Sequence, residues 1–280
     1  MWGPALALGS AVAAGAGDYL CGITSRRTGT LSCMSAFFTT ALVPAVAWVL
    51  LSGQRVPGEI TVAAAIGAGL ATTVGLGAFL KATSVGTISI VAPISATGVV
   101  VPIAIGLARA DYPSVLQAVG IVSAVVGVAF AVRSPEGHPS SASESGVGFA
   151  LLAAVGFGLF YWLMAPASRQ SVPWAAMVAD AVPVLTCVVA VRIQHTPFGA
   201  MREARNIRSV LAAALLGSAG FVLYAFATRH GALPIVSVLA CLFPVVTILL
   251  ARSLLGERVA RTQQVAIGAV LTGVVLMTIG

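Results

Sequence analysis

The chain is a series of apolar runs about 20 residues long, which is the length a helix needs to cross a lipid bilayer. Short polar or Gly/Pro-rich segments separate the runs, and 59% of the 280 residues are hydrophobic while only 8% are charged. A soluble domain carries about 25% charged residues and cannot hide this much apolar surface. The sequence therefore predicts an all-α integral membrane protein, because a span in lipid must satisfy its own backbone hydrogen bonds.

Ten runs are long and apolar enough to be spans, so we expect ten transmembrane helices. The first run lacks a basic segment before it and exceeds the usual length of a signal-peptide core, so it is interpreted as the first span and not as a cleaved signal. The expected spans are 4–24, 30–52, 60–80, 87–108, 114–132, 147–165, 173–193, 208–228, 234–254 and 262–280.

One low-complexity segment divides the chain. Residues 133–145, with the sequence RSPEGHPSSASES, are polar and rich in Ser and Pro, which is typical of a flexible linker. The linker separates five expected spans in residues 1–132 from five in residues 146–280. A second polar segment, 195–208, contains three arginines and is expected to be either a short surface helix or a charged loop.

The two halves resemble each other in sequence. The segment GTISIVAPIS begins at Gly86 and GALPIVSVLA begins at Gly231. Further pairs follow in the same order along both halves: Gly127 with Gly273, and Gly15 and Gly17 with Gly156 and Gly158. Because five spans is an odd number, the second half enters the membrane from the opposite side, so we predict two inverted five-helix repeats. Such repeats place a substrate site near the membrane midplane, and the alternative is a duplicated scaffold that transports nothing.

Three segments resemble a known transporter family. GDYLCGITSRR (17–27), VAPISATGVVVPIAIG (91–106) and LLGERVARTQQ (254–264) resemble the drug/metabolite transporter superfamily, and specifically its EamA-type members with ten helices. The first half departs from the family turn, because residues 109–113 read RADYP where Gly-Glu-Arg-Pro is expected. The resemblance implies a central cavity lined by the first four and the sixth to ninth helices, with alternating access. It also implies transport without ATP, and the chain has no phosphate-binding GxxxxGK[ST] motif.

Two acidic residues, Asp18 and Asp180, fall inside expected spans. A carboxylate in the hydrocarbon layer is costly, so its presence indicates a function by default. Each is expected either to exchange a proton or to pair with an amine on the substrate. The alternative is a carboxylate that faces a water-filled vestibule or fixes a helix contact.

Aromatic and hydroxyl side chains offer further candidates for substrate binding, since aromatic rings bind apolar and cationic groups. Tyr and Trp near helix ends are also common as anchors at the membrane interface, which is the alternative for these residues. The candidates are Tyr19, Tyr161, Trp162 and Tyr224, with Ser89, Ser95 and Ser237.

The remaining reactive residues do not form a recognisable catalytic or metal-binding motif. The three histidines are scattered through polar segments, and the spacing of the four cysteines fits neither a zinc site nor a disulfide framework. The net charge of +7 is carried by basic residues between apolar runs, which indicates the positive-inside rule and not a nucleic-acid partner. We therefore expect no enzyme activity, no cofactor and no metal.

The leading hypothesis is a secondary transporter in a bacterial inner membrane that exports a small metabolite, an amino acid or an amphipathic compound. Proton exchange or the substrate gradient would drive it, so its expected partners are lipid, a small-molecule substrate and, in the first case, protons. An uptake permease for a sugar or similar solute is the first alternative, and a non-transporting membrane scaffold or sensor is the second. The sequence names no substrate and no oligomeric state.

The distribution of basic residues predicts an orientation. Eleven of the 15 basic residues follow odd-numbered spans, and four follow even-numbered spans. The positive-inside rule then places both termini outside the cell, whereas the family resemblance implies cytoplasmic termini. We take outside termini as the working prediction.

Overall fold

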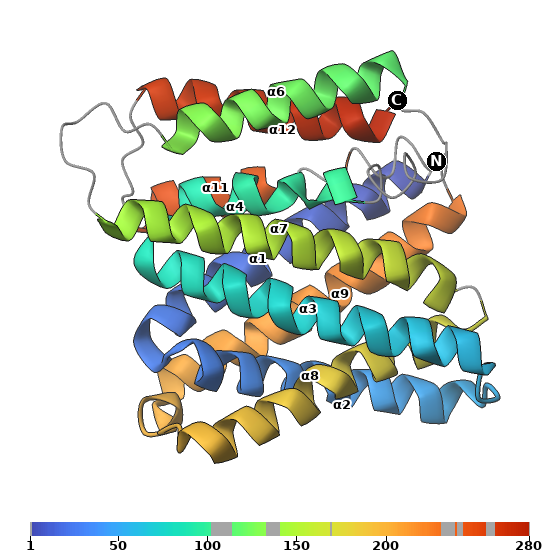
Figure 1. Cartoon of the computed structure of the whole chain (residues 1–280). Coiled ribbons are helices and arrows are strands. Elements are labelled where there is room, and N and C mark those ends of the chain that lie inside the picture. Colours follow the sequence, from blue (N-terminus) through green and yellow to red (C-terminus); the bar gives the residue numbers. More distant parts are fainter. Residues whose placement is uncertain are drawn as a thin grey trace.

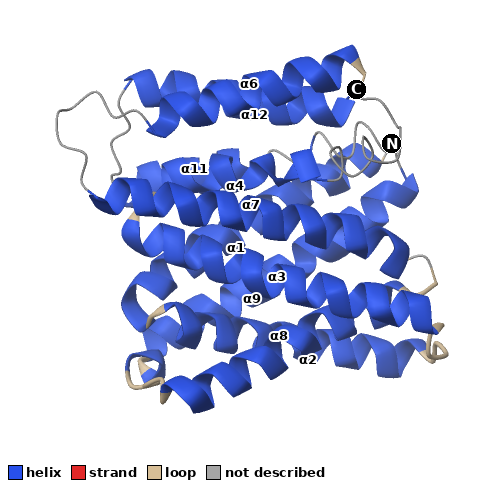
Figure 2. Cartoon of the chain, in the orientation of Figure 1, coloured by secondary structure: helices blue, strands red, loops and turns tan. Residues whose placement is uncertain are grey.

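The structure is a computed structural model that describes residues 2–101, 114–132, 141–168, 170–230, 239, 243–255 and 261–279. Within these ranges the protein is helical and contains no strand (Figure 2). The long helices of the first half are α1 (Gly3–Thr28), α2 (Thr30–Ser52), α3 (Glu59–Val85), α4 (Ile88–Ala96) and α6 (Val115–Val132). Those of the second half are α7 (Ser141–Ala167), α8 (Val172–Gln194), α9 (Ala204–His230), α11 (Phe243–Leu255) and α12 (Arg261–Ile279).

Two glycines mark the opposite ends of the bundle. Gly29 alone separates α1 from α2 and has φ +83°, while Gly53 ends α2 with φ +58°. Both angles lie in the region that favours a residue without a Cβ, so the chain can reverse or end a helix abruptly there. We call these the Gly29 end and the Gly53 end. Both chain termini lie at the Gly53 end (Figure 1).

The helices pack in pairs that join the two halves. α1 lies against α9 and α11, and α3 lies against α7 and α8. α2 packs on α8, α4 packs on α7 and α11, and α6 and α12 form a separate pair along one side of the bundle (Figure 1). Nearly every large interface therefore contains one helix from each half.

Small residues allow these interfaces to close. A methyl group added to Gly127 in α6 would lie 2.8 Å from the backbone nitrogen of Val270, and one added to Gly273 in α12 would lie 2.6 Å from that of Ala124. Such distances leave no room for a side chain, so the two backbones touch. This close approach through glycine is common between helices in membranes.

Among the described residues, six helices, α1, α2, α3, α7, α8 and α9, are long and apolar enough to cross a membrane. Three shorter apolar helices lie at Val115–Ala124, Val245–Leu255 and Gln264–Leu276. The exposed large side chains of the outer helices are apolar, for example Leu50, Leu185 and Val189. The expectation of an all-α membrane protein is confirmed at this level.

Several helix bounds differ from the expected spans. α7 begins at Ser141, inside the segment 133–145 that was expected to be a linker. α9 begins at Ala204, so the arginines at 205 and 208 lie in its first turns and only Ala200–Arg202 forms a separate short turn. Residues 102–113, 133–140, 231–238 and 256–260 lie outside the described residues, as does part of the expected spans 87–108 and 234–254.

Candidate functional site

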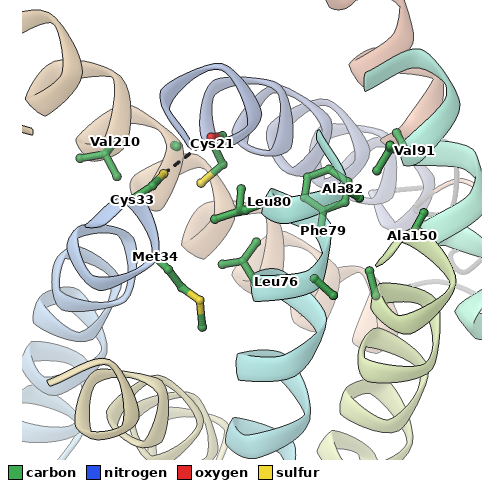
Figure 3. Close-up of a cluster of buried hydrophobic side chains, with 14 of the residues drawn as sticks. Cys21, Cys33, Met34, Leu76, Phe79, Leu80, Ala82, Val91, Ala150 and Val210 are labelled. Carbon is green, nitrogen blue, oxygen red and sulfur yellow. Dashed lines mark hydrogen bonds between the residues drawn. The ribbon is translucent and has the colours of Figure 1, made fainter. Parts of the chain in front are cut away.

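A buried apolar cluster fills the middle of the bundle toward the Gly29 end. Figure 3 shows Cys21 of α1 and Cys33 of α2 close to each other and to Leu80 of α3, with Phe79 of α3 and Val91 of α4 toward the other side of the same cluster. The Cys33 thiol donates a hydrogen bond of 3.6 Å to the carbonyl oxygen of Cys21. Side chains from four helices of the first half thus contribute to one buried cluster.

Polar contacts at the same end tie α1 to α3. Arg26, in the last turn of α1, donates from Nε to the carbonyl oxygen of Thr83 at 2.6 Å and from Nη2 to that of Gly86 at 2.7 Å. The hydroxyl of Thr24 donates to that of Ser209 in α9 at 2.7 Å. The ends of three helices are therefore held together by side-chain hydrogen bonds as well as by apolar packing.

Different contacts occur at the Gly53 end. Trp174 at the start of α8 donates from Nε1 to the carbonyl oxygen of Gln54 at 3.1 Å. The backbone N–H of Gly58 donates to the side chain of Gln170 at 2.8 Å, and the hydroxyl of Ser171 donates to the side chain of Gln54. These bonds join the loop between α2 and α3 to the turn between α7 and α8.

The two candidate carboxylates lie on different helices. Asp18 is half-buried near the middle of α1, and Asp180 is half-buried in the first half of α8. No hydrogen bond from another described residue reaches either side chain in the structure. α1 and α8 make at most marginal contact, and both pack against α2 and α3. Within the described part of the chain the two carboxylates therefore lie on separate helices and do not form one pair.

The other predicted site residues are spread through the bundle. Tyr19 is buried beside Ile88 and Ala251, and Ser95 is buried with its hydroxyl donated to the carbonyl oxygen of Val91 at 2.9 Å. Tyr224 is half-buried against Ala7 and Ala227 near the Gly53 end, and Trp162 is half-buried in α7. The side chains of Ser89, Tyr161 and Ser237 lie outside the described residues.

A groove of about 530 Å³ opens between α2, α8 and the start of α9. Its walls are apolar except for a row of hydroxyls on α2 and one guanidinium, that of Arg192 near the end of α8. The hydroxyls donate within their own helix, for example from Thr39 to the carbonyl oxygen of Ser35 at 2.7 Å, so outward they offer acceptors. An apolar body with an acceptor or anionic head at Arg192 fits this chemistry.

The groove was not predicted from the sequence. Its signal is the spacing of Ser35 and Thr39, because residues four positions apart share one face of a helix, with Thr40 next to them. Asp180 stands four residues, or one turn, before Val184, which lines the same groove. Among the described residues no group of histidine, cysteine or acidic side chains could hold a metal ion.

Comparisons with known proteins agree with the fold. A crystal structure, titled only as that of a protein, matches with a TM-score of 0.65 over 98% of this chain and 94% of its own, at 15% sequence identity. At that identity the likeness shows the fold alone. No curated protein matches the sequence.

The family model of EamA-like transporters matches residues 144–279, which comprise α8, α9, α11, α12 and nearly all of α7. The match agrees with the resemblance to the drug/metabolite transporter superfamily that the sequence motifs predicted. Members of this family are transporters and not enzymes. The match covers 136 of the 280 residues, all of them in the second half of the chain, and this half is therefore similar to the EamA-like transporters.

Proposed function

We propose that the chain is a secondary transporter built from two inverted five-helix repeats, residues 1–132 and 146–280, that moves a small amphipathic molecule by alternating access. The match of residues 144–279 to the EamA-like transporters carries this proposal. The groove beside Arg192, with apolar walls and a single cation, favours the amphipathic class among the expected substrates. Export across a bacterial inner membrane is the direction we propose, and uptake is the alternative.

Matched contacts in the two halves support the repeat. A methyl group added to Gly15 in α1 would collide with the carbonyl oxygen of Phe243, and one added to Gly158 in α7 would collide with that of Gly98. Phe243 stands 145 residues after Gly98, the offset seen in the sequence between Gly86 and Gly231. The same contact between an early and a late helix is therefore made twice, with the halves exchanged.

These contacts change which residues of the two halves we take as equivalent. The sequence pattern aligned Gly15 with Gly156, whereas the contacts make Gly158 its counterpart, an offset of 143. A second pair agrees, because a methyl group added to Gly75 would lie 3.1 Å from the backbone nitrogen of Phe157 and one added to Gly220 would lie 3.2 Å from that of Ala14. Phe157 stands 143 residues after Ala14, and Gly220 stands 145 after Gly75.

The pair α6 and α12 supports inversion over a parallel repeat. Gly127 meets Val270, and Gly273 meets Ala124, so the two helices run antiparallel with equivalent residues in contact. A two-fold axis along the helices would make equivalent helices parallel. An axis perpendicular to them, in the plane of the membrane, makes them antiparallel, which is the relation in inverted repeats.

Asp18 is the residue we propose for coupling. It lies within a helix long enough to span the membrane, and no described residue neutralises it through an ion pair. Proton exchange on this carboxylate, or its pairing with an amine of the substrate, would link binding to the movement of the helices. Asp180, one turn from the groove, is the second candidate for substrate binding.

Transport by purified protein in proteoliposomes tests the proposal. A panel of labelled amphipathic compounds and metabolites is followed with and without a pH gradient. Asp18→Asn should keep the protein folded and reduce pH-driven transport at least about tenfold, since a single catalytic proton site commonly contributes that much. Glu59→Gln is the control, because Glu59 is an exposed acid at the start of α3. Wild-type rates in Asp18→Asn would refute coupling by Asp18, and no transport of any compound would favour a scaffold or sensor.

A further inference from the structure

The two guanidinium hydrogen bonds of Arg26 end on the last turn of α3. α3 ends at Val85, so the carbonyl oxygen of Thr83 has no partner within the helix, and Gly86 is the capping residue. Arg26 satisfies both carbonyl oxygens at 2.6 and 2.7 Å and places a positive charge at a helix C-terminus, where the peptide dipoles favour it. One side chain of α1 thus caps α3.

The backbone of α1 is close to α3 and α4 at the same point. A methyl group added to Gly22 would lie 3.1 Å from Cδ1 of Ile88 and 3.6 Å from the hydroxyl of Thr83. The hydroxyl of Ser25 is 3.4 Å from the carbonyl oxygen of Leu80. The contact between α1 and the α3–α4 junction is therefore continuous over the last two turns of α1.

Counterpart residues in the second half are less enclosed. At the offset of 145, Leu76 of α3 corresponds to Phe221 of α9, and Phe79 corresponds to Tyr224. Leu76 and Phe79 are 6% and 1% exposed, whereas Phe221 and Tyr224 are half-buried. α1 packs against α3, but their counterparts α7 and α9 make at most marginal contact in the described part of the chain. Within the described residues, α1 and α3 are therefore packed together toward the Gly29 end, whereas α7 and α9 make at most marginal contact.

We propose that Arg26 is the latch that holds the Gly29 end closed, and that its release from the α3 carbonyls opens a path between the repeats at that end. This inference rests on the proposed transport function, since a gate has a role only in a protein that alternates between two openings. Arg26 is a positioning residue: it acts by fixing α1 against α3, and no contact with substrate is required of it. Breaking the two charge-assisted bonds removes much of the preference for this closed state.

The sequence repeats the elements of the latch. Ser25 and Arg26 recur as Ser168 and Arg169 at the offset of 143, which is the register that the glycine contacts give for α1 and α7. Thr83 recurs as Thr228 at the offset of 145. A duplicated arginine is expected if each repeat supplies a latch for one end. The placement of Arg169 lies outside the described residues, so the proposal concerns Arg26 alone.

The test compares two reporter cysteines in a protein whose native cysteines are replaced by alanine. Leu76→Cys reports on the Gly29 end, and Phe221→Cys reports on the counterpart position in α9. The rate of alkylation by N-ethylmaleimide is measured for each reporter in proteoliposomes. Arg26→Gln should raise the rate at position 76 about tenfold, the effect expected on losing hydrogen bonds to a charged group, and should lower the rate at position 221.

Two further variants separate a latch from general loosening of the fold. Arg27→Gln is the matched control, because Arg27 is the next residue, is exposed, and has no hydrogen bond to α3 in the structure. It should change neither rate. Arg26→Lys keeps one charged donor and should restore part of the protection at position 76, because lysine cannot reach two carbonyl oxygens with a planar fork.

Faster alkylation at position 76 together with slower alkylation at position 221 in Arg26→Gln is the outcome that supports the latch. A rise at both positions in Arg26→Gln would mean that the fold is loosened and would overturn it. Unchanged alkylation at position 76, in a protein that transports, would overturn the latch and leave the transport function standing. The reciprocal change in a protein that moves no compound of the panel would support the latch and count against transport.

Discussion

The two ends of the bundle have similar hydrogen bonds at the starts of α2 and α8, but they differ in the contacts between α1 and α3 and between α7 and α9. At the Gly29 end, the hydroxyl of Ser32 at the start of α2 donates to the carbonyl oxygen of Pro197 at 3.2 Å. At the Gly53 end, Trp174 at the start of α8 donates to the carbonyl oxygen of Gln54 at 3.1 Å. Trp174 stands 142 residues after Ser32, and Pro197 stands 143 after Gln54, so the proposed repeat relates these two contacts to each other.

The inner helices, α1, α3, α7 and α9, do not share this symmetry. α1 is joined to α3 through Arg26 at the Gly29 end, while α7 and α9 have at most marginal contact within the described residues. The starts of α2 and α8 therefore each donate a hydrogen bond to a loop carbonyl oxygen, whereas the contacts of α1 with α3 and of α7 with α9 differ within the described residues. A transporter that alternates between two openings needs such a difference between its ends, because rigid elements rock about a shared interface.

The largest effect is expected for cysteine labelling from one side of the membrane. A cysteine on that side should react, and one on the other side should not react at all. Loops that carry most of the basic residues lie at the Gly29 end, so this end is predicted to face the cytoplasm. In a cysteine-free protein in intact cells, Val56→Cys at the Gly53 end should react with an impermeant thiol reagent. Ser84→Cys at the Gly29 end should resist it.

Both positions are exposed in the structure, so access across the membrane decides the result and burial does not. Labelling of permeabilised cells is the control, and there both cysteines should react. Reaction of Ser84→Cys alone in intact cells would reverse the orientation and support the cytoplasmic termini that the family resemblance implies. The latch would then hold the outer opening closed.

The next largest effect tests whether the halves are equivalent. Gly15→Ala and Gly158→Ala each add a methyl group against a backbone carbonyl oxygen of the other half. Each should lower the free energy of unfolding by about 2–3 kcal/mol, which is typical of overpacking a tight interface, and the two losses should be similar. Unfolding in mixed detergent with increasing sodium dodecyl sulfate measures both.

Gly148→Ala is the matched control for the two glycine variants. It also lies in a helix, but a methyl group added there has no neighbouring atom within 4 Å. The helix propensity of alanine should make this variant neutral or more stable by up to about 1 kcal/mol. Strong destabilisation by Gly15→Ala with a neutral Gly158→Ala would show that the two contacts are not equivalent and would weaken the repeat.

The sequence predicted the helices well where a glycine or proline ends the apolar run. The span 30–52 coincides with α2 because Gly29 and Gly53 bound it on both sides. It failed at α9, which begins at Ala204 and not at 208, since a helix continues into the polar region where charged residues end the hydropathy signal. The proposed repeat pairs Gly15 with Gly158, two residues from the Gly156 of the sequence alignment, and the pattern Gly-x-Gly matches itself when shifted by two.

The candidate site was harder to predict. The sequence singled out Asp18 and Asp180 by their cost in a membrane, and this reasoning needs no knowledge of packing. It could not show that α1 and α8 make at most marginal contact, because which helices touch depends on tertiary structure. Arg26 was counted only as one of the basic residues that set the orientation. The recurrence of Ser-Arg at 25–26 and 168–169 was the signal that could have singled it out.

The smallest effect is predicted for the hydrogen bonds at the starts of α2 and α8. Ser32→Ala and Trp174→Phe each remove one hydrogen bond between neutral groups, at positions that correspond in the two halves. Each should lower the free energy of unfolding by at most about 1 kcal/mol, and less for Trp174, whose bond is exposed to solvent. Neither should alter the alkylation rates at positions 76 and 221, because these hydrogen bonds are similar at both ends. If either variant instead shifts those rates reciprocally, as Arg26→Gln is expected to do, then closure is shared with α2 and α8 and is not confined to the inner helices.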